Sequence, residues 1–182
     1  MDDRFFTSIG EGRTISLILA LKDGPLIMRD LKHVLSNSQS LRGRLDKMER
    51  DGLITISISL DGHKYVVAEL TELGKDVAML FSMTNLLISP GKEIGEKSID
   101  MKHFDDVVRL LRDKEYMVQG DIVKNIKTFD TVIRVLGAME SDGLVIKEEV
   151  HEGCRQIRYS LTPLGKQIAD VFESVHQKMM AI

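Results

Sequence analysis

Along residues 41–60, the apolar residues recur first at the spacing of a helix and then at the spacing of a strand. From Leu41 to Met48 they lie at i, i+4 and i+7, on one stripe of a helix. Gly52 suits the left-handed residue that ends a helix. Apolar and polar residues then alternate over residues 54–60, as in a half-buried strand. An Asp-Gly turn signal follows, and residues 63–70 are expected to form the return strand of a hairpin. This stretch predicts an amphipathic helix followed by a β-hairpin.

Two further helices are predicted before this stretch. Residues 14–22 are mostly apolar and end at an Asp-Gly-Pro turn signal, and the apolar positions of residues 26–35 lie close to helical spacing. The following Ser36-Asn-Ser38 predicts a turn and an N-cap for the next helix. A helix, a short polar turn and an amphipathic helix form a helix-turn-helix. Thr71 is expected to cap a further helix after the hairpin.

Two sequence motifs occur twice at one offset. Met48-Glu-Arg-Asp-Gly-Leu-Ile54 returns as Met139-Glu-Ser-Asp-Gly-Leu-Val145, 91 residues later. Leu70-Thr-Glu-Leu-Gly-Lys75 returns as Leu161-Thr-Pro-Leu-Gly-Lys166 at the same offset. An offset of this length is too long for a solenoid repeat, so the repeats predict two copies of one small domain.

The predicted fold is therefore α+β and mostly helical, with two tandem units. The first unit spans residues 1–90 and the second spans residues 99–182, with residues 91–98 as a polar linker. Each unit is expected to hold three helices, a β-hairpin and a C-terminal helix. In the second unit the helices are predicted at 103–113, 119–127 and 128–142, the strands at 144–150 and 155–161, and the long last helix from Thr162.

The last predicted helix carries an apolar seam of Ile168, Phe172, Val175 and Met179, spaced at +4, +3 and +4. Such a seam contacts another helix. Because it lies near the end of the chain, we predict a homodimer through the C-terminal helix. The alternative is that the seam forms part of the core within one chain.

The charge is distributed unevenly between the two repeats. The whole chain has a net charge of −3, which argues against a non-specific binder of polyanions. Residues 29–50 nevertheless contain six Lys and Arg against three Asp and Glu, whereas residues 120–141 contain three of each. A basic surface is therefore expected on the first copy and not on the second.

The remaining composition excludes several classes of protein. The 43% apolar and 29% charged content is that of a globular domain. Cys154 is the single cysteine, so no intrachain disulfide is expected, and with His151 it supplies only two of four zinc ligands. No apolar run approaches the roughly 20 residues of a membrane span, and the acidic start lacks the basic region of a signal peptide. We predict a cytoplasmic protein with no membrane association, metal or cofactor.

No segment resembles a phosphate-binding glycine loop, a nucleophile elbow or a metal-protease helix, so an enzyme is not expected. By contrast, Arg44-Leu-Asp-Lys-Met-Glu-Arg-Asp-Gly-Leu-Ile54 and Tyr159-Ser-Leu-Thr-Pro-Leu-Gly-Lys166 resemble two parts of the winged-helix transcription regulators of the MarR, PadR and HxlR kinds. The first resembles the recognition-helix end that runs into the wing, and the second resembles the end of the wing. Those families usually hold one winged helix per chain and dimerise, whereas this chain holds two.

The resemblance implies that the third helix of each unit enters the major groove and that the wing touches the DNA backbone or minor groove. In the first copy, Gln39 and Arg42 are expected to read base edges, and Arg44 and Arg50 to contact phosphates. Asp46 departs from this pattern because a carboxylate repels phosphate. The expected DNA-binding set is Ser38, Gln39, Ser40, Arg42, Gly43, Arg44, Lys47, Arg50, His63 and Lys64.

The corresponding face of the second copy is a poorer groove reader. It holds Asp130, Arg134, Gly137 and Ser141, flanked by Ile133, so one cation is offset by one anion. Arg134 and Arg155 are the expected secondary, weak DNA contacts, and glutamates surround Arg155. We assign this copy mainly to protein contact or dimerisation.

The sequence therefore predicts a transcription regulator that binds double-stranded DNA through its first helix-turn-helix. The alternative is an architectural protein whose winged helices bind other proteins without touching DNA, which the acidic net charge and the weak second face favour. A small-molecule effector is compatible with the pattern but not indicated by it.

Overall fold

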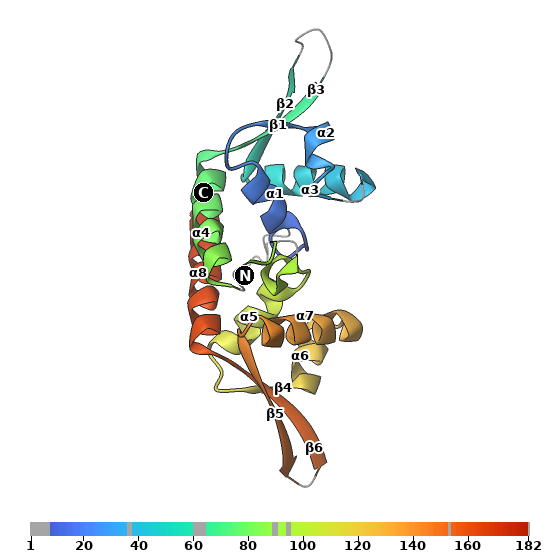
Figure 1. Cartoon of the computed structure of the whole chain (residues 1–182), viewed down its shortest axis with the longest axis vertical. Coiled ribbons are helices and arrows are strands. Elements are labelled where there is room, and N and C mark those ends of the chain that lie inside the picture. The colour runs from blue at the N-terminus through green and yellow to red at the C-terminus, as the bar shows by residue number, and fades with distance from the viewer. Residues whose placement is uncertain are drawn as a thin grey trace.

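The computed structural model describes residues 8–35, 38–59, 65–88, 91–93, 96–152 and 154–181. Its elements form an elongated molecule with two halves at opposite ends of the long axis (Figure 1). We call residues 8–88 the first half and residues 96–181 the second half. The fold is α+β and mostly helical, as predicted, with two small antiparallel sheets.

The two halves have nearly the same order of elements. The first half holds α1 (Thr14–Ala20), β1 (Leu26–Ile27), α2 (Met28–Leu31), α3 (Ser38–Arg50), β2 (Ile54–Ser59), β3 (Tyr65–Leu70) and α4 (Glu72–Leu87). The second holds the short 3-10 helix η2 (Ser98–Asp100), α5 (Phe104–Arg112), β4 (Met117–Val118), α6 (Gln119–Ile126), α7 (Phe129–Ser141), β5 (Val145–Glu152), β6 (Cys154–Leu161) and α8 (Pro163–Met180). The sheet orders are β1-β3-β2 and β4-β6-β5.

The predicted amphipathic helix and hairpin of the first half are confirmed. Leu41, Leu45 and Met48 of α3 are buried, and Gly52 has a φ of +73° just after the helix. In the hairpin, Ile54 pairs with Leu70 in an antiparallel register. The predicted Asp-Gly turn lies outside the described residues.

The prediction of one helix over residues 26–35 is wrong at its start. Leu26 and Ile27 form β1, which pairs with Ala68 and Val67 of β3. The helix α2 that follows spans only Met28–Leu31. A two-residue strand is too short to show the alternation of apolar and polar residues by which a strand is predicted. It forms because the partner strand β3 provides its hydrogen bonds.

A repeated Thr-x-x-Gly motif fixes the junction between each hairpin and the helix that follows. The Thr71 side chain accepts a hydrogen bond from the Gly74 N–H at 3.0 Å, and Thr162 accepts one from Gly165 at 3.0 Å. Both predicted N-caps are thus confirmed. A Cβ on either glycine would lie 2.0 Å from a backbone carbonyl oxygen before the hairpin. Close approach of two backbones therefore explains why glycine recurs at this position.

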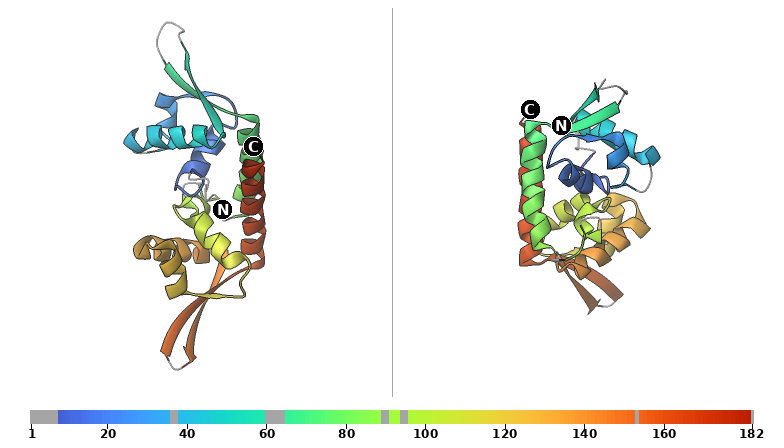
Figure 2. Two further views of the ribbon diagram at one scale, coloured as in Figure 1. Left: turned by 180° about the vertical axis from the view of Figure 1, so that it is seen from behind. Right: turned by 45° about the horizontal axis from the view of Figure 1, so that its top comes forward.

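Helices α4 and α8 lie side by side along one edge of the molecule, and both views in Figure 2 show them together. Asp76 near the start of α4 pairs with Lys178 near the end of α8 at 2.7 Å, so the helices are antiparallel. The Phe172 ring of α8 lies 5.3 Å from that of Phe81 in α4 and 5.2 Å from that of Phe104 in α5. One continuous apolar core therefore includes side chains of both halves.

This packing occupies the apolar seam of the last helix. Ile168, Phe172, Val175 and Met179 are all buried within the chain, with exposed fractions of 0–4%. The seam therefore forms intramolecular core, which was the alternative. It gives no support to the predicted homodimer through the C-terminal helix.

The C-terminal end of the predicted linker, residues 91–98, lies inside the protein. Lys97 and Ser98 are buried, and η2 begins at Ser98. The Lys97 Nζ donates to the backbone and side-chain oxygens of Asn85, at 2.7 and 2.8 Å, near the end of α4. The Ser98 N–H donates to Asp142 Oδ2 at 2.8 Å. Polar composition suggested a linker here, but the polar groups of Lys97 and Ser98 have partners inside the protein.

The halves also exchange reciprocal hydrogen bonds at the starts of their first helices. The Arg13 N–H donates to the Asp100 carbonyl at 2.8 Å, and the His103 N–H donates to the Gly10 carbonyl at 3.1 Å. Arg13 and His103 precede α1 and α5 with φ of 73° and 67°. The donor residues of the two bonds lie 90 positions apart in the sequence, and so do the two acceptor residues. This reciprocity is the pattern of an isologous two-fold interface.

The side chains at this interface are not equivalent. The Asp100 carboxylate accepts hydrogen bonds from the Ser16 N–H at 3.2 Å and from the Ser16 hydroxyl, so the second half caps α1 of the first. The equivalent position in the first half is Gly10, which has no side chain to cap α5. Asp100 is buried, and this burial raises the pKa of its carboxyl to about 6, although the bonds from Ser16 and the charge of Arg13 oppose the rise.

Asp100 is expected to make stability fall as the pH rises. Its folded-state pKa of about 6 exceeds the ordinary aspartate pKa of 3.8, so the folded protein keeps a proton that the unfolded chain loses between these values. The free energy of unfolding should therefore decrease by about 2 kcal/mol from pH 4 to pH 6 through this group. Urea denaturation of the wild type and Asp100→Asn over pH 4–7 measures the effect. Parallel pH profiles of the two proteins would contradict it.

Candidate nucleic-acid interface

Helices α3 and α7 lie on the same side of the molecule. Figure 1 shows both at the edge opposite the α4–α8 pair, with the β2–β3 and β5–β6 hairpins pointing outward at the two ends of the long axis. The views in Figure 2 agree. Both α3 and α7 are thus available on one side of a single chain, with one hairpin at each end of its long axis.

The outer face of α3 carries exposed cations. Arg42, Gly43 and Arg50 are exposed, whereas the leucine and methionine stripe faces inward. The Arg42 Nε lies 2.9 Å from Asp46 Oδ1, one helical turn away. Asp46, which was expected to repel phosphate, is therefore paired with the neighbouring cation. Because both side chains are about half exposed, this pair contributes little to stability, about 0–1 kcal/mol.

Two other expected DNA contacts turn toward residues 8–13 of the same chain. The Arg44 Nη1 donates to the Gly12 carbonyl, and the Lys47 ammonium pairs with the Glu11 carboxylate. Arg44 and Lys47 are both half-buried. These two cations therefore hold α3 against the loop that also contacts the second half.

Glu11 is the acidic centre of this contact. Burial acts to raise the pKa of Glu11, but the hydrogen bond from Lys47 and the charges of Lys47, Arg44 and Lys102 outweigh it and lower the pKa. The carboxylate is therefore ionised at neutral pH and neutralises part of the basic charge of α3. Sequence reasoning missed this role, because 36 residues separate Glu11 from Lys47 and no local pattern links them.

Five of the expected contacts cannot be placed. The backbone of α3 begins at Ser38, but the side chains of Ser38, Gln39 and Ser40 lie outside the described part of the structure, as do His63 and Lys64. Their assignment to DNA stays a prediction from the resemblance.

The residues expected on the outer face of α7 are exposed in the structure. Asp130, Arg134, Gly137 and Ser141 are exposed, and Ile133 is half-buried. Sequence reasoning did not single out Phe129, the first residue of α7, whose side chain is 59% exposed.

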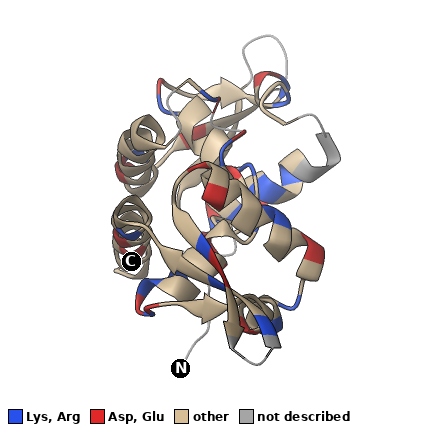
Figure 3. Cartoon of the chain, turned by 60° about the horizontal axis from the view of Figure 1, so that its bottom comes forward, with Lys and Arg blue, Asp and Glu red and all other residues tan. Residues whose placement is uncertain are grey.

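The second hairpin carries paired charges. Arg155 Nη2 donates to Glu149 Oε2 at 3.1 Å, and His151 Nε2 lies 3.4 Å from Glu149 Oε1. In the view of Figure 3, positions of Lys and Arg lie among positions of Asp and Glu along the described elements. A carboxylate therefore engages the cation expected to contact DNA from this hairpin.

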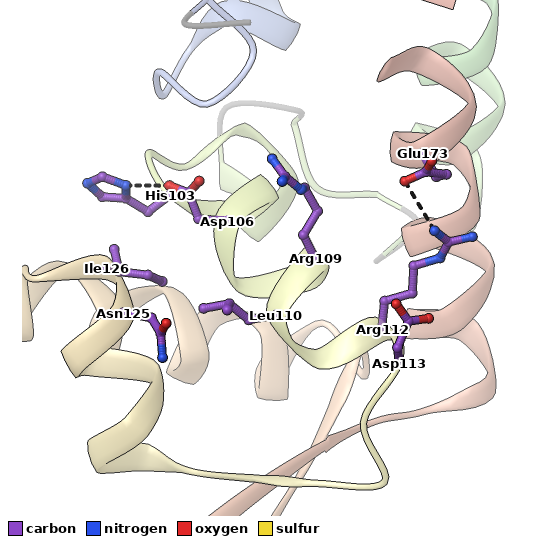
Figure 4. Close-up of a pocket in the computed structure, with 9 residues that line it drawn as sticks. All are labelled: His103, Asp106, Arg109, Leu110, Arg112, Asp113, Asn125, Ile126 and Glu173. Carbon is purple, nitrogen blue, oxygen red and sulfur yellow. Dashed lines mark hydrogen bonds and ion pairs between the residues drawn. The ribbon is translucent and has the colours of Figure 1, made fainter. Parts of the chain in front are cut away.

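A surface pocket of about 530 Å³ lies in the second half, between α5, α6 and α8 (Figure 4). Arg112 in this pocket pairs with Glu173 at 3.1 Å and with Asp170 at 3.3 Å, and His103 Nδ1 lies 2.7 Å from Asp106 Oδ2. Four of the charged or titratable side chains that line the pocket are thus paired within the chain. The pocket is not between the two halves, where an effector site would link them.

The described residues contain no group of three or more His, Cys, Asp or Glu side chains placed to hold a metal ion. The side chain of Cys154 lies outside that part. None of the described helices is long and apolar enough to span a bilayer.

A segment of the second half matches a known family. Residues 119–181 match the family described as HxlR-like helix-turn-helix. The matched segment runs from α6 through α7 and the β5–β6 hairpin to the end of α8, about a third of the chain. No curated protein matches the chain.

The match indicates a helix-turn-helix protein of a kind that regulates transcription by binding DNA, typically without enzymatic activity. It lies in the second half, which the charge pattern had made the weaker DNA reader. The resemblance to HxlR-type regulators inferred from the sequence is thereby confirmed for this half.

Proposed function

We propose that the chain is a DNA-binding transcription regulator in which two tandem winged-helix domains contact one side of a duplex. The observation that carries this proposal is the placement of α3 and α7 on the same side of the molecule, with a hairpin at each end (Figure 1). Winged-helix regulators usually reach this arrangement with two chains. Here the reciprocal bonds from Arg13 and His103 hold the halves as a two-fold dimer interface would.

In this proposal α3 supplies the main contact. Arg42 and Arg50 are the exposed cations of its outer face, and phosphate neutralisation by such residues supplies most of the affinity for DNA. To contact DNA, Arg42 must leave its ion pair with Asp46. Breaking this pair costs little free energy because both side chains are exposed to solvent. Arg44 and Lys47 position the helix through residues 8–13. The weakly charged α7 adds contacts with Arg134.

Replacing Arg42 and Arg50 together with alanine should weaken duplex binding at least about tenfold. Each lost phosphate contact should also reduce the slope of log affinity against log salt by about 1. Fluorescence anisotropy with a labelled duplex at several salt concentrations measures both quantities. Lys166→Ala, an exposed cation on the α4–α8 side, is the matched control and should bind like the wild type. Unchanged affinity and slope in the double variant would remove α3 from the interface.

A protein-binding module without DNA contact is the second candidate function. It is favoured by the engagement of Arg44 and Lys47 within the chain and by the net charge of −3. Heparin chromatography separates the two candidates. Retention that is lost in the Arg42→Ala, Arg50→Ala variant supports DNA binding. Passage without retention, together with a protein that co-purifies in stoichiometric amount, supports the second candidate.

A further inference from the structure

The outward face of α4 is apolar and exposed over about two turns. Its residues Met79, Met83, Leu86 and Leu87 are 63%, 58%, 76% and 53% exposed. They recur at i, i+4, i+7 and i+8, so they lie on one stripe of the helix, opposite the buried Val77 and Phe81. We call these four residues the α4 stripe.

The pseudo-equivalent helix α8 shows that the fold does not need an apolar outer face. At the offset of 91 residues, the α4 stripe corresponds to Asp170, Ser174, Gln177 and Lys178, all of which are exposed and polar. Both helices bury their inner faces in the same core, and Phe81 contacts Phe172 across it. The two outer faces nevertheless differ completely in polarity. The apolar character of the α4 stripe therefore points to a contact that α8 does not make.

The α4 stripe is suited to pack against a copy of itself. No Asp, Glu, Lys or Arg occurs in α4 after Asp76, so two facing stripes bring no like charges together and desolvate no ion. Four partly exposed side chains of this size form a patch of a few hundred Å². Two such patches with their rims reach about 1,000 Å², the lower bound expected of a specific protein interface.

We propose that a second copy of this chain docks on the α4 stripe, with the two α4 helices antiparallel about a two-fold axis near Met83. This axis places Met79 of each copy beside Leu86 and Leu87 of the other, because Met79 and Leu87 are four residues on either side of Met83. Such a contact is isologous and closes at two copies. It differs from the contact through α8, whose seam is filled within the chain.

The proposed dimer has a consequence that rests on the proposed function. Since α4 lies opposite α3 and α7 (Figure 1), the dimer directs the α3–α7 sides of its two copies away from each other. Two duplexes would then bind back to back, so the dimer bridges separate DNA segments.

Measuring the mass of the full chain tests the contact without DNA. At tens of micromolar, light scattering after size exclusion should give twice the 20.5 kDa of one chain for the wild type. Met83→Glu should give the single-chain mass. Ser174→Glu, at the equivalent position of α8, is the matched control and should stay dimeric. Circular dichroism checks folding, which neither change should disturb because both side chains are outside the core.

Two outcomes would overturn the proposal. A wild type of single-chain mass, including one that binds lipid vesicles or another protein through the α4 stripe, excludes the second copy as its occupant. A dimer that persists in Met83→Glu and in Met79→Glu with Leu86→Glu excludes the stripe as the contact.

Bridging of two differently labelled duplexes separates this proposal from the proposed function. Met83→Glu should lose bridging while it keeps binding to one duplex. A wild type that is dimeric but binds no DNA would contradict the proposed function alone. The mass measurement would then still support the dimer.

Discussion

Replacing Gly165 with alanine should destabilise the protein by more than about 3 kcal/mol. The added Cβ would lie 2.0 Å from the Leu144 carbonyl oxygen and 3.0 Å from its carbonyl carbon, so α8 and the segment before β5 must separate. The Gly165 N–H bond to Thr162 lies in the same turn and would be strained by this movement. Urea denaturation at constant pH measures the loss.

Gly137 provides the control for this change. It lies on the exposed face of α7, and nothing lies within 4 Å of an added Cβ. Gly137→Ala should therefore be neutral or stabilise the protein by up to about 1 kcal/mol, through helix propensity. If Gly165→Ala is as stable as Gly137→Ala, the close approach does not govern this junction. Gly74→Ala should be as damaging as Gly165→Ala, since its Cβ meets the Leu53 carbonyl oxygen at the same 2.0 Å.

Replacing Phe172 with alanine should cost about 3–5 kcal/mol, the range for removing a buried phenylalanine side chain. Phe172 is 1% exposed, and its ring contacts those of Phe81 and Phe104, so the cavity would open where α4, α5 and α8 meet. Chemical denaturation measures the cost. Hydrogen exchange should also increase in α4, because the substitution removes a contact between the halves.

Phe129 offers a matched control for the loss of a phenyl ring. Its side chain is 59% exposed at the start of α7, so Phe129→Ala should change the free energy of unfolding by less than about 1 kcal/mol. Equal losses in the two variants would mean that the three-ring contact does not join the halves. Unchanged exchange in α4 of Phe172→Ala would lead to the same conclusion.

Much of the local structure could be predicted from the sequence because its signals are periodic and short-range. The stripe from Leu41 to Met48 determined the buried side of α3, and the alternation after Gly52 determined the hairpin. The caps at Thr71 and Thr162 could be read from the residues beside them, because a cap bonds within its own turn. The glycines of the two repeated motifs also have a physical cause, because each lets two backbones approach closely.

The candidate interface was predicted less completely, because a helical pattern places cations on a face without showing what that face contacts. Arg42 and Arg50 are exposed, as expected for residues that approach DNA. Arg44 and Lys47 instead contact residues 8–13, which lie more than 30 positions earlier in the chain. Residue type alone did not distinguish these two pairs of cations.

The sequence by itself determined the elements and their repetition, and the tertiary structure decided which surfaces meet. The seam of α8 specified that its side chains would be buried, and only the fold showed that α4 and α5 bury them. The strand β1 and the cap from Asp100 to Ser16 also arise from partners distant in sequence. Periodicity reports the environment of a side chain, whereas the identity of its neighbour depends on how the whole chain packs.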